Sequence, residues 1–589
     1  KFGQPIICGS LYTFEHAENG KTYGFDKVIM LAGGIGYGKK ADSLKDEPVA
    51  GDKVVLMGGD NYRIGMGGGA VSSVATGEYA GAIELNAIQR SNPEMQKRVY
   101  NAIRALSEED RNPIVSIHDH GAGGHLNCLS ELVEATGGRI DIDKLPVGDP
   151  TLSAKEIIGN ESQERMGMVM KEEEIAHAKA IADRERAPMY VIGEATGDMQ
   201  FTFVDNKNGD KPIDLKLEYM FGKAPRTIMR DNTVPCSYKA PEYEAGRIGE
   251  YLEDVLRLEG VACKDWLTNK VDRSITGRIA VQQTDGQIQL PINDYRCITL
   301  DYHGRQGIAT ALGHAPAVAL ASPEAGSVMA IAESLTNIVF APIEGGIKGV
   351  SLSANWMWPC KNPGEDARLY AAVKAASDFA IGLGINIPTG KDSLSMTQKY
   401  RDGEPVYAPG TVIITSAGQV SDISRAVRAA AKHRKSDFVY VDFSHSSFAL
   451  GGGSFAQIVG AVGSKVPTVE SADYFVKAFA AVQSLLDGKK VLAGHDVSDG
   501  GLIVTLLEMV FASQSAGIDV DITSLGEKDI VRALFSERPA VVLQVENGSA
   551  VASELKGLGV DAYVIGSFND ERRFKVKNGD DEQSFDIDA

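Results

Sequence analysis

Residues 118–124 read HDHGAGG and residues 495–501 read HDVSDGG, so a histidine–aspartate pair precedes a Gly-Gly step twice in one chain. Four further pairs of segments match in the same order along the chain. Each pair is identified by one equivalent residue from each copy: Val28 and Val412, Gly67 and Gly451, Arg165 and Arg538 (the last residues of SQER and FSER), and Val191 and Val564. The offset falls only from 384 residues (412 minus 28) to 373 (564 minus 191). Ordered matches at a nearly constant offset indicate an internal duplication.

Each copy alternates short apolar runs, glycine-rich turns and helical patterns, which is typical of an α/β domain. The repeat predicts equivalent domains over residues 21–205 and 430–575, and a different unit over residues 270–425. In that unit we expect strands at 274–281, 287–292, 349–356 and 410–418, and two long helices. In the first copy, Ser91 is the expected cap of a helix with Pro93 in its first turn.

The composition excludes several classes of function. The net charge is −19 with no tract rich in Lys or Arg, so we expect no nucleic-acid partner. The six cysteines are scattered without a C-x-x-C pair, which argues against a zinc site or a disulfide framework and for a reducing compartment. No apolar run reaches the roughly 20 residues of a membrane span, so we expect a cytoplasmic protein without a membrane partner.

A helix that begins at Ser322-Pro323 places Glu333 and Asn337 one turn apart on one face. Carboxylate and amide oxygens at that spacing suit Mg²⁺, a hard cation. A solvated helix face is the alternative interpretation of the same pattern.

The HDVSDGG run places His495, Asp496, Ser498 and Asp499 before a Gly-Gly turn and an apolar helix. An acid and a hydroxyl at a helix N-terminus can hold a metal and a phosphate together, or can act only as helix caps. The first copy offers His118, Asp119 and His120, where a histidine acts as a base or donor, or is a buried structural residue.

Two further polar runs are candidates for phosphate or substrate binding. IPTGKDSLSM places Thr389, Gly390, Lys391, Asp392 and Ser393 in a row after a strand, where a lysine beside hydroxyls suits a phosphate. This run lacks the P-loop spacing, and a solvated turn is the alternative. NESQER, residues 160–165, gathers six polar residues as ordinary loops also do, and the glycine-rich runs MGGGA and GGGSF are anion nests or only turns.

Taken together, these segments resemble the large, single-chain bacterial type of phosphoribosylformylglycinamidine synthase. The resemblance is carried by NYRIGMGGGAVSS, IHDHGAGG, NESQER, VIGEAT, ESLTNI, LSANW, PGEDARLY, IPTGKDSLSM and HDVSDGGL, in family order over nearly the whole chain. It implies an α/β (α+β) chain with the duplicated A-plus-B architecture shared with aminoimidazole ribonucleotide synthetase. The implied domains are a remnant of the first A domain at 1–20, the first B domain with a connector at 21–250, the second A domain at 251–425 and the second B domain at 426–589.

The family is a ligase of purine biosynthesis that converts formylglycinamide ribonucleotide, ATP and glutamine-derived ammonia to formylglycinamidine ribonucleotide, through an iminophosphate. The resemblance implies the cofactors ATP or ADP and Mg²⁺, with the metal ligands Asp294, Glu333, Asn337 and Asp496. It implies nucleotide contacts from Cys8, Gly9, Ser10, Asn293 and Ser498 in that same second-copy site, which holds an auxiliary nucleotide in the family.

The reacting site is then expected in the pseudo-symmetric position. The repeat assigns catalytic roles there to His118, Asp119, Lys391 and Asp392. It assigns substrate contacts to Asn160, Glu161, Ser162, Gln163, Glu164, Arg165, Asn355, Thr389, Gly390 and Ser393.

Compared with the family, the sequence lacks the N-terminal region with its ammonia-channel domain, and no Cys-His-Glu set of a glutaminase domain follows residue 575. KFGQPIICGSLYTF, which has no initial Met, looks like the end of a strand, so we expect a synthetase-core fragment that does not itself hydrolyse glutamine. Two alternatives stay open: another ATP-dependent enzyme of this fold, such as the single-copy aminoimidazole ribonucleotide synthetase, and a nucleotide-binding scaffold without catalysis.

Overall fold

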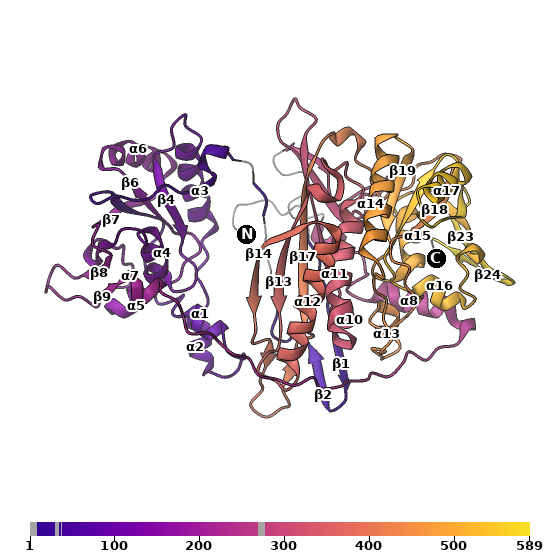
Figure 1. Ribbon diagram of the computed structural model, residues 1–589, viewed down its shortest axis with the longest axis horizontal. Coiled ribbons are helices and arrows are strands. Elements are labelled where there is room, and N and C mark those ends of the chain that lie inside the picture. Colours follow the sequence, from indigo (N-terminus) through magenta and orange to yellow (C-terminus); the bar gives the residue numbers. More distant parts are fainter. Residues whose placement is uncertain (1–8, 30–33, 37, 269–276, 589) are drawn as a thin grey trace. The chain divides into compact units, whose positions relative to one another are not determined.

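The computed structural model describes residues 9–29, 34–36, 38–268 and 277–588. The chain divides into two compact units (Figure 1). Unit 1 contains Gly36–Ile228, and unit 2 contains Met229–Ala589 together with the described residues between 9 and 35. The segments 21–35 and 229–250, which the sequence groups with the first B domain, thus fall in unit 2.

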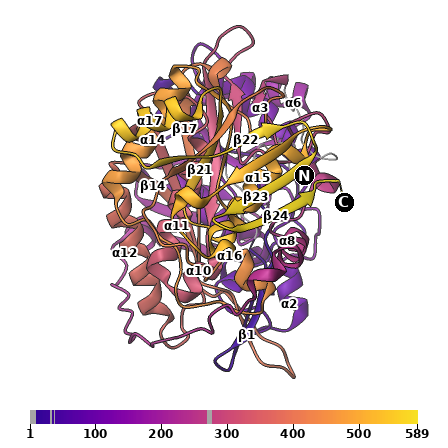
Figure 2. The same ribbon diagram turned by 90° about the vertical axis from the view of Figure 1, so that its right-hand side faces the viewer.

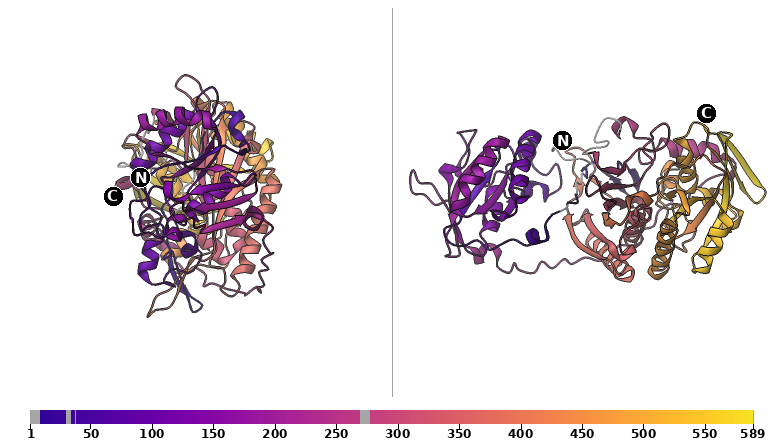
Figure 3. Two further views of the ribbon diagram at one scale, coloured as in Figure 1. Left: turned by 90° about the vertical axis from the view of Figure 1, so that its left-hand side faces the viewer. Right: turned by 90° about the horizontal axis from the view of Figure 1, so that it is seen from above.

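Unit 1 is built on one seven-stranded sheet covered by helices on both faces (Figure 3). The strand order is β4 (Ile114–Asp119), β6 (Met166–Met170), β3 (Lys53–Met57), β7 (Met189–Ala195), β5 (Gly138–Asp141), β8 (Gln200–Val204) and β9 (Ile213–Lys216). On the central β3, Val54 and Leu56 pack with α4 (Gly124–Leu132) and α5 (Ala154–Ile158). Val55 and Met57 pack with α3 (Pro93–Ser107) and α6 (Ile175–Glu185) on the other face, as the period of two along a strand requires.

Unit 2 contains a second seven-stranded sheet with the same order, whose strands β22 to β24 face the viewer in Figure 2. Its order is β19 (Val491–Asp496), β21 (Ala540–Val545), β18 (Asp437–Asp442), β22 (Ala562–Asn569), β20 (Gly517–Asp521), β23 (Arg573–Asn578) and β24 (Asp581–Asp586). Both sheets also carry a bulge at the same place, where β3 pairs with β7 and β18 pairs with β22. The predicted duplication is therefore confirmed.

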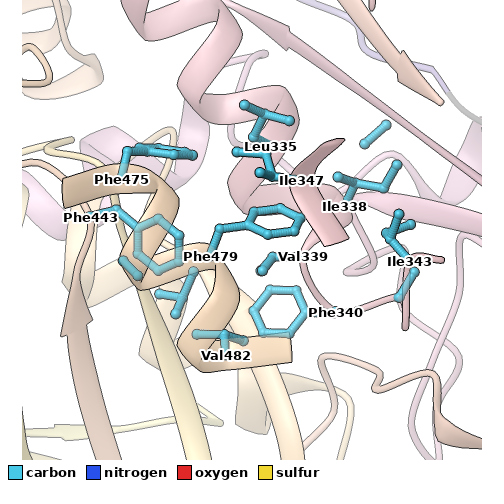
Figure 4. Packing of buried hydrophobic residues seen from close by; sticks show 14 of the residues in the cluster. Leu335, Ile338, Val339, Phe340, Ile343, Ile347, Phe443, Phe475, Phe479 and Val482 are labelled. Atoms are coloured by element: carbon cyan, nitrogen blue, oxygen red, sulfur yellow. The ribbon is translucent and has the colours of Figure 1, made fainter. Parts of the chain in front are cut away.

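A six-stranded sheet precedes that second sheet along the chain and belongs to unit 2. Its order is β10 (Ile279–Val281), β11 (Tyr295–Thr299), β12 (Gly307–His314), β17 (Thr411–Val420), β13 (Val350–Met357) and β14 (Asn386–Ser393). Helices α11 (Pro323–Ile338) and α12 (Glu365–Leu383) accompany it. Leu335 and Ile338 of α11 meet Phe475 and Phe479 of α14 (Ala472–Asp487), so this sheet and the second seven-stranded sheet share one core (Figure 4).

A small sheet completes unit 2. The hairpin of β1 (Glu15–Glu18) and β2 (Lys21–Gly24) pairs through β2 with β16 (Val406–Tyr407), which in turn pairs with β15 (Thr397–Gln398). This pairing ties the first described residues to the segment that follows β14.

Several element predictions are confirmed. Strands β13 and β17 cover the expected 349–356 and 410–418, and Ser322 caps α11 by accepting a hydrogen bond from Ala325 N at 3.2 Å. In the predicted strand at 274–281, residues 274–276 lie outside the described residues and 279–281 form β10. Among the described residues, no helix is long and apolar enough to cross a membrane.

Three local predictions are wrong. Asn92 rather than Ser91 caps α3, because Asn92 Oδ1 accepts from Met95 N at 3.0 Å. Residues 287–292 form a turn and not a strand, since Gln289 takes a left-handed φ of 57° and Leu290 folds back to bond Asp285. Residues 389–393 do not follow a strand but lie within β14, where pairing with β13 holds them extended.

Candidate functional site

Unit 2 gathers carboxylates around His495 at the end of β19. The ring Nε2 lies 3.0 Å from Glu508 Oε2 on α15 (Gly501–Phe511) and 3.4 Å from Asp294 Oδ2, next to β11. The ring Nδ1 lies 3.2 Å from Asp496 Oδ1. Asp294, His495 and Asp496 offer ligand atoms within 4.8 Å of one another, so strands β11 and β19 bring together residues 200 positions apart.

Two side chains of this cluster hold buried oxygens without a hydrogen-bond partner among the described residues. Asn337 Nδ2 donates to Leu312 O at 3.0 Å, which fixes the amide and leaves its Oδ1 unpartnered. Oδ2 of Asp496, which is 1% exposed, has no partner there either, while Oδ1 of the same carboxylate faces His495 Nδ1 at 3.2 Å. With Asp294 and His495 these residues line a cavity of about 10 Å³, which is room for one small ion or one water.

The charges of the cluster favour a cation. Burial raises the pKa of Asp294 to about 8, although 40% of its side chain is exposed at the mouth of the cluster, and Asp496 and Glu508 add to that rise. Burial also raises the pKa of Glu333 well above its usual range. Burial alone lowers the pKa of His495, but Asp294 and the other acids outweigh it, so that its pKa lies well above the usual value. Buried oxygens without donors and neighbouring acids with raised pKa values fit Mg²⁺, which takes oxygen ligands.

Glu333 lies one turn before Asn337 on α11 and is half-buried. Its Oε2 accepts from His314 N at 2.7 Å, and His314 Nε2 lies 2.9 Å from Ser10 Oγ. The interpretation of this helix face as solvated is therefore wrong. These contacts place Ser10 at the edge of the carboxylate cluster.

The other residues predicted to contact the nucleotide differ in burial and in hydrogen bonding. Asn293 uses its whole amide internally, since Nδ2 donates to Gln282 O at 2.9 Å and Oδ1 accepts from Ala429 N at 3.0 Å. Ser498 is half-buried in the turn before α15. Gly9 is exposed, and Cys8 lies outside the described residues.

Sequence reasoning missed several members of the cluster, above all Glu508 and Glu537. Glu508 is the one acid within the apolar helix LIVTLLEMV, and a charge on an otherwise buried helix was the signal that it faces a partner. The Glu537 carboxylate accepts a hydrogen bond from the backbone N–H of Ser454. Burial, and to a lesser extent the charge of Asp499, raises the pKa of Glu537 to about 8.

In unit 1 the corresponding histidine has different neighbours. His118 Nδ1 lies 3.1 Å from Glu131 Oε2 and its Nε2 lies 2.7 Å from Lys45 Nζ, while Asp119 is exposed. His120 is instead fully buried, with its Nε2 2.9 Å from His125 Nδ1, and burial lowers its pKa well below the usual value. His120 is thus the buried structural residue that the sequence left as an alternative.

The NESQER run of unit 1 is largely engaged within its own unit. Five of its six residues are buried, and Gln163 alone is exposed. Asn160 Nδ2 donates to Tyr62 O and Ile64 O, and Ser162 donates to Glu164, which also pairs with Arg90.

Arg165, the last residue of the run, is fully buried and donates to Asn61 Oδ1 at 2.6 Å, to His125 Nε2 at 2.6 Å and to Asn160 Oδ1. Burial lowers its pKa to about 9.

In unit 2, the remaining predicted site residues lie on two neighbouring parallel strands. Asn355 of β13 is the register partner of Lys391 on β14, and Ser353 is the partner of Thr389. Register partners on parallel strands share a face, so these side chains line one side of the sheet. Thr389 through Asp392 are exposed, and Gly390 passes so close to β13 that a Cβ would lie 1.9 Å from Ala354 O.

Comparisons with known protein families match most of the chain. The FGAR-AT PurM N-like domain family matches residues 263–419. The C-terminal domain family of AIR synthase related proteins matches twice, over residues 49–206 and 445–578. These two matches cover most strands of the two seven-stranded sheets.

Two curated relatives are 38% identical to this chain. One is "Probable phosphoribosylformylglycinamidine synthase, chloroplastic/mitochondrial" of Arabidopsis thaliana, over 98% of this chain, and the other is phosphoribosylformylglycinamidine synthase of Homo sapiens, over 93%. The chain spans 42% of the length of each.

Among solved structures, Thermotoga maritima PurL complexed with FGAR has a TM-score of 0.62 at 18% identity and covers 89% of this chain and 73% of its own. The same protein complexed with ATP has a TM-score of 0.59 at 18% identity, over 90% and 72%. These likenesses confirm the expected α/β fold of the AIR synthetase-like type.

Proposed function

The chain belongs to the phosphoribosylformylglycinamidine synthase family, and on that premise we propose that it carries the ATP-dependent ligase part of that enzyme. The proposed reaction converts formylglycinamide ribonucleotide to formylglycinamidine ribonucleotide in purine biosynthesis. The amide oxygen takes the γ-phosphoryl group of ATP and ADP leaves. Ammonia then adds to the carbon, and phosphate leaves. The observation that carries the nucleotide-binding part of the proposal is the buried carboxylate cluster in unit 2, with Asn337 Oδ1 and Asp496 Oδ2 free to bind a cation.

In this proposal Asp294, Glu333, Asn337 and Asp496 hold Mg²⁺. The ion screens the charge of a bound polyphosphate. Asp496 Oδ2 and Asn337 Oδ1 are buried oxygens without a donor among the described residues, and Glu333 keeps Oε1 available while Oε2 accepts from His314 N.

Nucleotide contacts are assigned to Ser498 and to the segment of Cys8, Gly9 and Ser10. Ser10 is supported by its contact with His314 beside the cluster. Asn293 supports this site indirectly, because its amide fixes the backbone at Ala429. This unit 2 site is the one we assign to an auxiliary nucleotide.

For the reaction itself we assign residues in each unit separately. In unit 1, Glu131 orients the His118 ring through Nδ1, and His118 with Asp119 accepts a proton from the attacking ammonia. Gln163, as the exposed member of NESQER, is assigned to substrate contact.

In unit 2, Lys391 and Asp392 are assigned to the phosphoryl group. The exposed Thr389 and Gly390, the half-buried Ser393 on the same strand, and Asn355 beside it are assigned to substrate binding. The ammonia is proposed to come from a glutaminase domain, and the cytoplasm is the proposed compartment.

The test is equilibrium binding of Mg-ADP and Mg-ATP by calorimetry to the wild-type chain and to a Glu333→Ala, Asp496→Ala variant. A Glu324→Ala, Asp473→Ala variant removes the same charge from exposed helix starts and serves as the matched control. We expect the control to bind as the wild type does and the cluster variant to lose binding. Equal binding by all three proteins, or no binding by a folded wild type, would contradict the proposed site.

A further inference from the structure

One glutamate carboxylate in unit 2 joins two loops that border the proposed metal site. Glu537 Oε1 accepts from Gly500 N at 2.7 Å, in the turn that follows Asp496 and begins α15. The same oxygen accepts from Ser454 N at 2.8 Å, where the glycine-rich run 451–453 enters α13 (Ser454–Ile458).

Unit 1 repeats this arrangement. Glu161 Oε1 accepts from Gly123 N at 3.1 Å, in the turn that follows Asp119 and begins α4. It also accepts from Gly69 N at 3.0 Å, where the glycine-rich run 67–69 enters α1 (Gly68–Ser72). Both copies therefore use one carboxylate oxygen to bond the glycine-rich loop and the turn after the histidine–aspartate pair.

The glycines of these loops leave the space that the carboxylate occupies. A Cβ at Gly453 would lie 2.8 Å from Glu537 Oε2, and a Cβ at Gly68 would lie 2.5 Å from Glu161 Oε2. At Gly453 an ordinary side chain would require the carboxylate to move, and at Gly68 it would also meet Ala87 O at 2.5 Å. The close approach of a glutamate is therefore one reason why glycine occupies these two positions.

We propose that Glu161 and Glu537 are the positioning residues of the two copies, each bonding its glycine-rich loop to the turn that carries the site residues. For Glu537 the inference rests on the proposed function of unit 2: the Gly500 bond holds the turn that directly follows Asp496 and contains Ser498. In unit 1 the N–H of Gly69 is thus taken by a carboxylate of the same chain, and in unit 2 Gly451 N and Gly452 N already donate to Lys465 O and Val462 O, which argues against phosphate nests at these N–H groups.

This assignment changes how the copies correspond. The sequence pairs SQER with FSER and so equates Glu164 with Glu537. By its contacts, however, Glu161 is the residue that matches Glu537, and Glu164 instead pairs with Arg90. Glu161 thus acts through the loops rather than on a substrate.

The test compares Glu537→Ala, Glu537→Gln and Gly453→Ala in the full chain, with Glu546→Ala as an exposed control. Calorimetry of Mg-ADP is run at a temperature at which circular dichroism shows every variant folded. We expect binding about tenfold weaker in Glu537→Ala and Gly453→Ala. Glu537→Gln should stay within about threefold of the wild type, because its amide oxygen still accepts both N–H groups.

Hydrogen exchange of the peptides that contain Ser454 and Gly500 is measured on the same proteins without ligand. Faster exchange there in Glu537→Ala, spreading to His495 and Asp496 and restored in Glu537→Gln, is the expected result. Unchanged exchange overturns the inference, as does wild-type affinity in a Glu537→Ala protein that only melts earlier. A wild type that binds no nucleotide defeats the proposed function alone, since the exchange result still decides the positioning role.

Discussion

In unit 1, His118 lies between an acid, Glu131, and a cation, Lys45, whereas in unit 2 its counterpart His495 lies among three carboxylates, of which Glu508 corresponds to Glu131. The scaffold around both histidines is the same, down to the order of seven strands. The difference lies in the charged side chains that neighbouring segments place beside the histidine, Lys45 in unit 1 and Asp294 in unit 2. A duplicated fold thus keeps its strand order while the corresponding histidine meets three carboxylates in one copy and one acid and one lysine in the other.

The largest effect should come from the buried arginines that end the two loops. Arg165→Ala leaves Asn61, Asn160 and His125 without their donor, and we expect a loss of about 3 kcal/mol in the unfolding free energy of unit 1. Arg538→Ala breaks the 2.6 Å ion pair with Asp442. Its cost should be smaller, about 2 kcal/mol, since backbone donors still contact that carboxylate.

The measurement is urea unfolding followed by two signals. The three tryptophans, Trp266, Trp356 and Trp358, all lie in unit 2, so tryptophan fluorescence reports that unit while circular dichroism reports both. Arg165→Ala should shift only the dichroism transition. A fluorescence shift as large as that of Arg538→Ala would show that the units do not unfold separately.

Magnesium should increase the difference in stability between unit 2 and unit 1. At one hundred times its dissociation constant, Mg²⁺ is expected to stabilise unit 2 by about 2.7 kcal/mol, because it binds only the folded cluster. The tryptophan transition should therefore move and the unit 1 transition should stay in place. Asp496→Asn should abolish the shift, and an equal shift in both units would count against a cation site confined to unit 2.

The equivalent helix caps should respond alike. Asn92 caps α3 by accepting from Met95 N at 3.0 Å, and Ser471 caps α14 by accepting from Tyr474 N at 3.3 Å. Each change to alanine should cost about 1 kcal/mol in its own unit. Thermal unfolding of the two single variants checks this, and a difference above about 1 kcal/mol between them would break the equivalence.

The last prediction concerns pH. The pKa of Glu537 in the folded protein, about 8, lies above that of an unfolded glutamate, so the folded state binds more protons between these values. Its contribution to stability is present at acidic pH and is lost as pH rises through about 8. The stability of the wild type relative to Glu537→Gln should therefore fall from pH 5 to pH 8. A flat difference in urea midpoints would contradict this linkage.

The sequence predicts the architecture well because the segments that match between the two copies lie on equivalent strands and turns. Segments at Val191 and Val564 fall on corresponding strands β7 and β22, and HDHGAGG and HDVSDGG end corresponding strands β4 and β19. The helix geometry that joins Glu333 and Asn337 was also readable, since it depends only on local spacing.

Contacts between distant segments were not readable. Glu161 matches Glu537 only through its bonds to backbone N–H groups 38 and 92 residues earlier in unit 1, and no local pattern predicts contacts over those separations. Residues 389–393 were expected after a strand, since Gly390, Asp392 and Ser393 are of types common in turns, and pairing with β13 overrides that preference. Asn293 was predicted to contact a nucleotide, but its side-chain amide forms hydrogen bonds with the backbone of Gln282 and Ala429.

The shared bulge has a consequence for ancestry and engineering. Ile192 in β7 and Ile565 in β22 are the extra residues in their pairings, and both are fully buried. A one-residue slip turns every later side chain to the opposite face of the sheet, so such a bulge fixes the pairing register of the residues on either side of it. Its presence in both copies dates it to the single ancestral gene. Chimeras that exchange strand segments between the copies should therefore place both crossover points on the same side of this isoleucine.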